Sequence, residues 1–104
     1  MNYSEMSDFE IDVAVAGIIH PGRKITNFAG EAVVWFGNLE TRIVRYCNSW
    51  TDAGPIILEN RIGLTPSVDI WHAYSDEEDF LCSIANPLRA AMIVFLMMHE
   101  AANA

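Results

Sequence analysis

The first regular pattern of apolar positions lies close to the start of the chain. Four apolar residues recur at the spacing of one helix face: Ile11, Ala14, Val15 and Ile18. Ser7 and Glu10 precede them in the S-x-x-E relation of a capping box, in which each side chain satisfies a free backbone N–H at the helix start. Because proline cannot continue the hydrogen-bond ladder, His20-Pro21-Gly22 ends the pattern. We therefore predict a first helix between Ser7 and His20.

The next part of the chain predicts one clear strand between two less regular segments. Residues 23–30 show no periodicity, so we expect a connection there. Residues 32–36 are short, β-branched and aromatic, and they stand between Gly30 and Gly37. This composition predicts a strand that is buried on both faces. Residues 38–48 fit neither period well, and we expect irregular structure with at most a short strand.

The remaining pattern predicts a second helix, three strands and a third helix. Thr51 or Ser49 can cap a helix over residues 52–60, with Pro55 in its first turn. Short strands are expected at residues 62–64, 68–74 and 80–84, the last two separated by a polar turn. Asn86-Pro87 then starts the last helix with an N-cap residue and a proline at the first helical position.

This order of elements predicts a single α+β domain over residues 1–104. Helices on both sides of a small, largely antiparallel sheet would bury the apolar faces, which makes an α-β-α sandwich. At 104 residues the chain is long enough for one hydrophobic core and too short for two ordinary domains.

The last helix is apolar around its whole circumference between Leu88 and Met98, apart from Arg89. Such a helix must be covered on more than one side, and one sheet covers only part of it. The rest contacts either another helix of the same chain or the same surface of a second copy. We favour a homodimer through Met92, Phe95 and Leu96, with two-fold symmetry because this symmetry is the commonest. The alternative, a helix covered within one chain, stays open.

Composition narrows the class of partner. Six Lys and Arg against fourteen Asp and Glu give a net charge of −8, which repels nucleic-acid phosphates and anionic membranes. Arg23-Lys24 and Arg42/Arg45 are pairs and not a patch. The longest apolar run, residues 90–98, is less than half of the ~20 residues that span a bilayer. With two cysteines and no C-x-x-C, we expect a cytosolic protein with reduced thiols and no direct nucleic-acid or membrane contact.

Two combinations of histidine and cysteine could carry chemistry. His72, Cys82 and His99 could bind zinc, but no two of these residues have the spacing of metal ligands. Cys47 could act as a nucleophile with His20 or His72, although buried cysteine is more often plain core packing. No sequence motif of a serine hydrolase, zinc protease, Rossmann turn or phosphate loop is present. We therefore assign no catalytic, cofactor-binding or metal-binding residue.

Two surface features have a functional and a structural interpretation. The acidic run Asp76–Asp79 could bind a cation or imitate a phosphate backbone, but a solvated hairpin turn is the simpler explanation. Trp35, Trp50 and Trp71 with Tyr46 could line a pocket. Trp50 is the best candidate for exposure, beside a helix start that could accept an anion.

Three stretches of the chain resemble a family of small proteins from lambdoid phages and prophages. The stretches are residues 3–11, residues 46–62 with Tyr46-Cys47-Asn48 and Pro55-Ile56-Ile57, and residues 86–98, Asn86-Pro87-Leu88-Arg89 onward. These are the NinX-type proteins, grouped under the name phage ABA-sandwich domain. The resemblance implies an α-β-α sandwich and a bacterial host cytoplasm, and it implies no activity or site residues.

The leading hypothesis is a phage accessory protein that binds an unidentified host or phage protein and is not an enzyme. Two alternatives stay open: an acidic DNA mimic that inhibits a nucleic-acid enzyme, and a small hydrolase or nuclease with an unrecognised site.

Overall fold

The computed structural model describes residues 2–104 and confirms the α+β class. A short 3-10 turn, η1 (Tyr3–Glu5), comes before three helices: α1 (Asp8–Ile19), α2 (Trp50–Glu59) and α3 (Pro87–Ala102). The strands that precede α2 are β1 (Lys24–Phe28), β2 (Glu31–Trp35) and β3 (Thr41–Val44). The strands that follow it are β4 (Gly63–Pro66), β5 (Trp71–Tyr74) and β6 (Leu81–Ile84).

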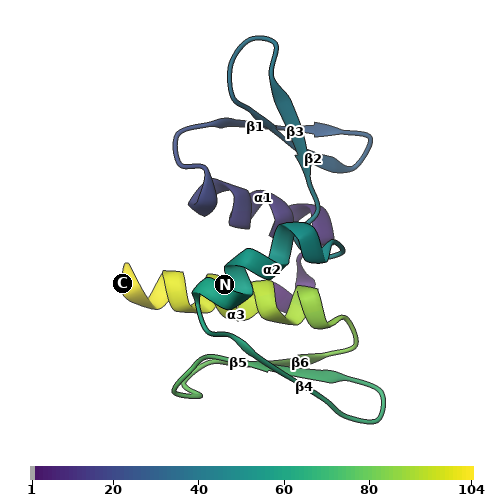
Figure 1. The fold of residues 1–104 in the computed structure, drawn as a ribbon, viewed down its shortest axis with the longest axis vertical. Coiled ribbons are helices and arrows are strands. Elements are labelled where there is room, and N and C mark those ends of the chain that lie inside the picture. The colour runs from purple at the N-terminus through teal and green to yellow at the C-terminus, as the bar shows by residue number, and fades with distance from the viewer. Residues whose placement is uncertain (1) are drawn as a thin grey trace.

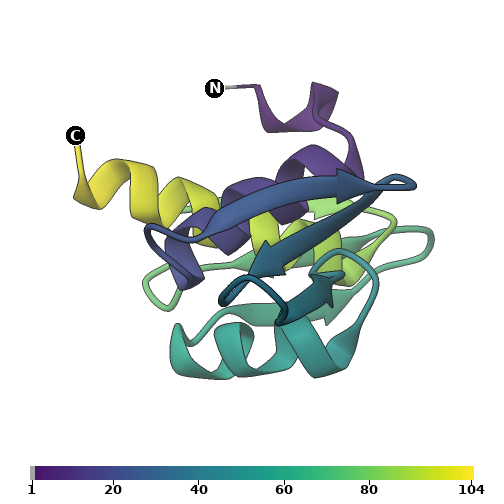
Figure 2. The same ribbon diagram turned by 90° about the horizontal axis from the view of Figure 1, so that it is seen from above.

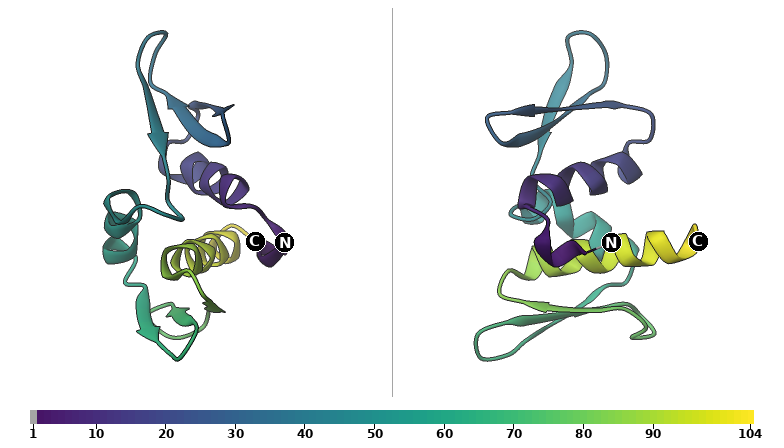
Figure 3. Two further views of the ribbon diagram at one scale, coloured as in Figure 1. Left: turned by 90° about the vertical axis from the view of Figure 1, so that its right-hand side faces the viewer. Right: turned by 180° about the vertical axis from the view of Figure 1, so that it is seen from behind.

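The strands form two antiparallel sheets, where the sequence pattern suggested one. The N-terminal sheet has the order β1-β2-β3, and the C-terminal sheet has the order β4-β5-β6. Figure 1 shows one sheet at each end of the long axis, with the three helices between them. Each sheet pairs strands that follow one another closely in the chain, whereas α2 separates β3 from β4. The layers therefore run sheet, helices, sheet, and each sheet has one face free of helices (Figure 3).

Strand β1 lies where the sequence analysis expected a connection, so that expectation was wrong. It pairs with β2 through a two-residue turn, Ala29-Gly30, in which both residues have positive φ (52° and 84°). This is the backbone of the primed turns that favour hairpins, and the Asn27 side chain accepts from the Gly30 N–H at 2.8 Å. Alanine is an unusual residue there, which explains why the turn was hard to read.

Helix α2 begins earlier than predicted, at Trp50, with Ser49 at the N-cap. Pro55 therefore lies in the second turn of the helix and not in the first. In the second turn a proline removes one intrahelical hydrogen bond. Of the two candidate caps, Ser49 occupies the N-cap position, although its side chain makes no capping hydrogen bond, and Thr51 lies inside the helix.

Helix α3 forms the centre of the molecule (Figure 2). It packs against β4, β5 and β6 on one side and against α1 and α2 on others, so its own chain covers it. Met92, Phe95 and Leu96 are only 0%, 7% and 5% exposed. The reasoning for a dimer through these residues was therefore wrong, because two helices and a sheet share the apolar circumference. No helix among residues 2–104 is long and apolar enough to cross a membrane.

Candidate functional site

A partly buried polar junction joins the N-terminal segment to α1 and α3. The Arg89 guanidinium on α3 donates to the Asp8 carboxylate at 2.8 Å. It also donates to the backbone carbonyls of Tyr3 at 3.2 Å and Met6 at 2.5 Å. Burial raises the pKa of Asp8, but hydrogen bonds from Asn48 and Arg89 outweigh that effect and hold the pKa below its usual value. Arg89 thus fixes η1 and the start of α1 on the central helix.

The same junction holds the loop before α2 through the backbone of Cys47. Its N–H donates to the Asp12 carboxylate at 3.0 Å, and its carbonyl accepts from the Asn86 amide at 2.8 Å. Asn86 also caps α3, since its side-chain oxygen accepts from the N–H groups of Leu88 and Arg89. Asp12 is only 5% exposed, and this burial raises its pKa to about 6, although the Cys47 N–H acts in the opposite direction.

The junction explains how the three stretches that resemble phage proteins work together. Residues 3–12, 46–48 and 86–89 are far apart in the chain and meet at this one place. Each of these polar side chains is used to hold backbone or another side chain. The arrangement therefore orients three helices, and spacing along the chain could not reveal it.

The structure does not bring the histidines and cysteines together. His72 lies on the helix-free face of the C-terminal sheet, where Nδ1 is 2.7 Å from the Ser83 hydroxyl. Cys82 lies on the opposite face of that sheet, and His99 lies near the end of α3. Over residues 2–104, no three His, Cys, Asp or Glu side chains are grouped so that they could hold a metal ion.

Cys47 lies at the N-terminal half of α1, where its thiol is directed to the Asp8 carbonyl at 3.9 Å. His20 lies at the far end of that helix, at its C-cap, and its ring packs edge-on against Phe36 at 5.1 Å. His72 is separated from Cys47 by α3 and the C-terminal sheet. Burial raises the pKa of the Cys47 thiol, which opposes formation of a thiolate nucleophile.

The candidate aromatic pocket residues are also separated. Tyr46 is buried, and burial raises its pKa to about 12. Trp50 is 56% exposed on α2, with its indole over Gly54, where a Cβ would lie only 2.8 Å from the ring. Trp71 shares the helix-facing side of the C-terminal sheet with Ala73, and Trp35 lies on the helix-free side of the N-terminal sheet.

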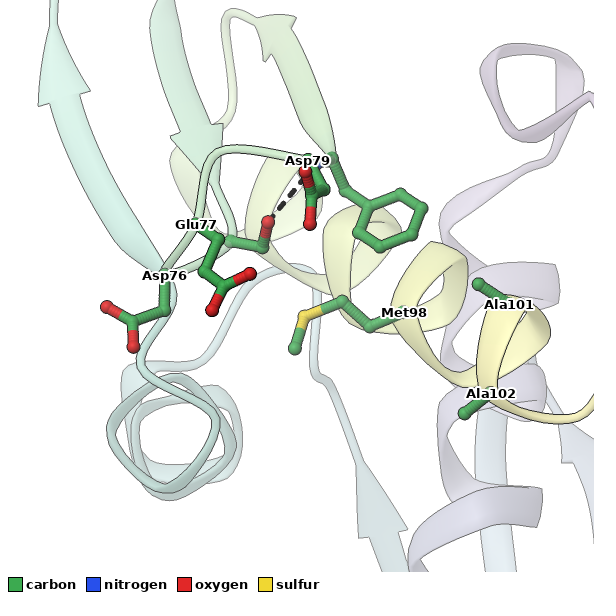
Figure 4. Close-up of a pocket in the computed structure, with 8 residues that line it drawn as sticks. Asp76, Glu77, Asp79, Met98, Ala101 and Ala102 are labelled. Carbon is green, nitrogen blue, oxygen red and sulfur yellow. Dashed lines mark hydrogen bonds between the residues drawn. The ribbon is translucent and has the colours of Figure 1, made fainter.

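The acidic run Asp76–Asp79 forms an exposed turn between β5 and β6, as predicted. Ser75 closes the turn, because its hydroxyl accepts from the Phe80 N–H at 3.1 Å. The acidic turn and the C-terminal end of α3 border an open hollow of about 510 Å³. Figure 4 shows Asp76 and Glu77 on the turn side of this hollow, with Met98 on the helix.

The helix-free face of the N-terminal sheet exposes large apolar side chains. Six residues form this apolar face: Thr26, Phe28, Val33, Trp35, Thr41 and Ile43. Phe28 is 69% exposed and Ile43 is 40% exposed, and the face carries a shallow hollow of about 580 Å³. The matching face of the C-terminal sheet carries two polar pairs, Thr65 with Tyr74 and His72 with Ser83, whereas this face carries one, in which the Trp35 indole N–H donates to the Thr26 hydroxyl at 2.9 Å.

Two cationic side chains, Lys24 and Arg45, border the apolar face. Arg23 and Lys24 open β1, while Arg42 and Arg45 lie in and just after β3, so the two sequence pairs share one sheet. Lys24 Nζ lies 5.5 Å from the centre of the Trp35 ring, and Arg45 pairs with Glu31 at 3.0 Å. Lys24 and Arg45 lie at opposite ends of the apolar face, and Arg42, which pairs with Val34, lies on the helix-facing side of the sheet, so the four cations do not form one patch.

Fold and surfaces define a small α+β protein with a partly buried polar junction at the starts of α1 and α3 and an exposed apolar face at one end. A family model described as Bacteriophage P22, NinX matches residues 2–99. The chain therefore belongs to this family of phage proteins, and the resemblance seen in the sequence is confirmed. No curated protein matches the chain.

Proposed function

We propose that this phage protein is an accessory protein that acts by binding another protein, from the host or the phage, and not by chemistry of its own. The observation that carries the proposal is the exposed apolar face. In an antiparallel sheet with one free face, that face is ordinarily polar.

Exposure of this kind is costly unless a partner covers it. Burial of a Phe or Ile side chain contributes roughly 1.5–3 kcal/mol. Phe28 leaves more than half of that contribution available to a partner. Contiguous exposed apolar residues with a polar rim are typical of protein–protein binding sites. Arg45, Glu31 and Lys24 provide such a rim here.

The test is site-specific photo-crosslinking in phage-infected host cells. A photoreactive amino acid replaces Phe28 in one strain and Leu58 in another. Leu58 is the matched control, because it is 74% exposed and lies on α2, away from the apolar face. We expect a foreign protein crosslinked from position 28 and not from position 58. The same products from both positions, or none from position 28, would overturn the proposal.

Substitution provides a second measurement. The double variant Phe28→Ser/Ile43→Ser, measured by affinity pull-down because it has no photoreactive residue at position 28, should reduce recovery of the identified partner about tenfold or more, the equivalent of ~1.4 kcal/mol. Leu58→Ser should leave recovery unchanged. Full recovery with the double variant would contradict a role for the apolar face.

A further inference from the structure

Charge is distributed unevenly along the long axis of the molecule. The N-terminal sheet and its connections, residues 20–48, contain four Lys and Arg and two Glu, a formal charge of +2. The segment between α2 and α3, residues 60–86, contains one Arg and five Asp and Glu, a formal charge of −4. Figure 1 places these two segments at opposite ends of the molecule, whose longest extent is 43 Å.

The basic end is also the apolar end. Trp35 lines both the hollow on the apolar face and a second hollow of about 360 Å³ that Arg23 and Lys24 border. A binding partner that fits both hollows would place an apolar side chain on the apolar face and carboxylates beside Arg23 and Lys24.

The acidic end presents that combination. The four carboxylates of residues 76–79 project from the β5–β6 turn, and Leu81 follows them with 59% of its surface exposed. Arg61 is the cation paired with this turn, at 3.6 Å from Asp76, and both side chains are well exposed. Exposed pairs of this kind contribute little, so the turn keeps most of its attraction for cations.

We propose that the apolar face of one copy binds the acidic turn, residues 76–81, of a second copy, so that the chain self-associates head to tail. The proposal uses the same face as the proposed function and names a second copy as an occupant. Face-to-face pairing would bring Lys24 of both copies to one apolar contact without adding an opposite charge, because Glu31 already pairs with Arg45. Head-to-tail contact pairs opposite charges instead and leaves a free face and a free turn at the two ends, so it extends into open chains.

The experiment is sedimentation velocity of the full chain over a wide concentration range, at low and at high salt. We expect the mean mass to rise with concentration at low salt and the association to weaken about tenfold or more at high salt, because the contact is between exposed charges. A chain that stays monomeric at all concentrations would overturn the proposal.

Two variants separate this geometry from every other mode of association. The face variant carries Lys24→Glu and Phe28→Asp, and the turn variant carries Asp76→Asn, Glu77→Gln, Glu78→Gln and Asp79→Asn. All six positions are exposed, so both variants should keep the far-UV circular dichroism of the unmodified protein. Each variant alone should be monomeric, while an equimolar mixture should form a one-to-one dimer that grows no further. Leu58→Asp is the control and should associate like the unmodified chain.

The mixture is decisive because each variant retains the surface that the other lacks. A turn variant that associates as strongly as the unmodified chain, or a mixture that stays monomeric, would overturn the proposal. Self-association and the proposed function fail independently. If the chain is monomeric but still crosslinks a foreign protein from position 28, only the proposed function stands. If the chain self-associates but gives no foreign crosslink, only the self-association stands.

Discussion

At the scale of single residues, Arg89 and Asp12 connect parts of the chain that no local interaction could hold together. Arg89 binds an acid 81 positions away, and Asp12 holds a backbone N–H 35 positions away. Arginine suits this place because its planar fork can donate to a carboxylate and to two carbonyls at once. Loss of either side chain leaves buried groups unpaired, which costs more than the hydrogen bonds contribute when made.

Arg89→Ala should lower the free energy of unfolding by about 2–3 kcal/mol, because it removes the cation that pairs with Asp8 and the guanidinium that donates to the Met6 and Tyr3 carbonyls. Arg89→Lys should recover part of this loss, since lysine keeps the charge without the fork. Urea denaturation measures both. Arg61→Ala, at an exposed site, should change stability by less than about 0.5 kcal/mol. Equal effects at positions 61 and 89 would contradict the role of the junction.

Asp12 makes stability depend on pH in a defined direction. Its pKa is about 6 in the folded protein and 3.8 without the fold, so the folded state binds the proton more tightly. The resulting contribution is fully present below pH 4 and is lost as the pH rises through 6, by at most about 3 kcal/mol. Asp12→Asn keeps an oxygen for the Cys47 N–H and removes the titration.

We therefore expect Asp12→Asn to raise the melting temperature more at pH 7.5 than at pH 4.5. Asp8 does not mask this effect, because its pKa is lowered and its contribution is lost only as the pH falls through that lower range. A constant difference in melting temperature across the two pH values would show that Asp12 does not titrate as described.

At the scale of elements, two glycines in similar local patterns have opposite roles. Gly63 on β4 faces Tyr74 on β5, whose ring would lie 2.2 Å from an added Cβ. The aromatic ring covers the glycine and lets its hydroxyl lie 3.0 Å from that of Thr65. Gly17 in α1 has open space around it, with no atom within 4 Å of an added Cβ.

Gly17→Ala should stabilise the protein by about 0.5–1 kcal/mol, because alanine loses less conformational freedom in a helix. Gly63→Ala should destabilise it by about 1–3 kcal/mol, since the Tyr74 ring must move. Thermal unfolding of the two variants, side by side, provides the measurement. If Gly63→Ala were neutral, the close packing of Tyr74 over β4 would be disproved.

At the scale of the whole molecule, α3 is the element that all other layers share. The C-terminal sheet, α1 and α2 pack on different sides of it, which is why an all-apolar helix needs no second copy here. The apolar face and the acidic turn, which we propose as binding surfaces, lie at the two ends of the long axis.

Phe95→Ala should destabilise the single chain by about 3–5 kcal/mol through the cavity it leaves in the core. It should act on unfolding and not on association, since residue 95 is 7% exposed in one copy. Urea denaturation at two protein concentrations tests this, because unfolding of a monomeric core shows no dependence on concentration. A concentration-dependent midpoint that this substitution abolishes would restore a dimer through α3.

The sequence by itself determined the features that depend on interactions between residues close together in the chain. The capping box of Ser7 and Glu10 forms with both of its hydrogen bonds, and Asn86-Pro87 starts α3 as expected. Residues 31–35 form a strand, and residues 76–79 form a turn. Each of these depends on backbone groups or packing close by in the chain, so local chemistry was sufficient to predict them.

Tertiary structure alone decided the features on which function depends. Whether six strands make one sheet or two, and which helix takes the centre, depends on contacts between segments that the sequence pattern treats separately. The polar junction was not predictable even though its residues stood in the stretches that resemble phage proteins, because Asp8, Cys47 and Arg89 meet only after folding. In the same way, Lys24 and Arg45 are far apart along the chain, and pairing of β1 and β3 with β2 places both at the border of one exposed apolar face.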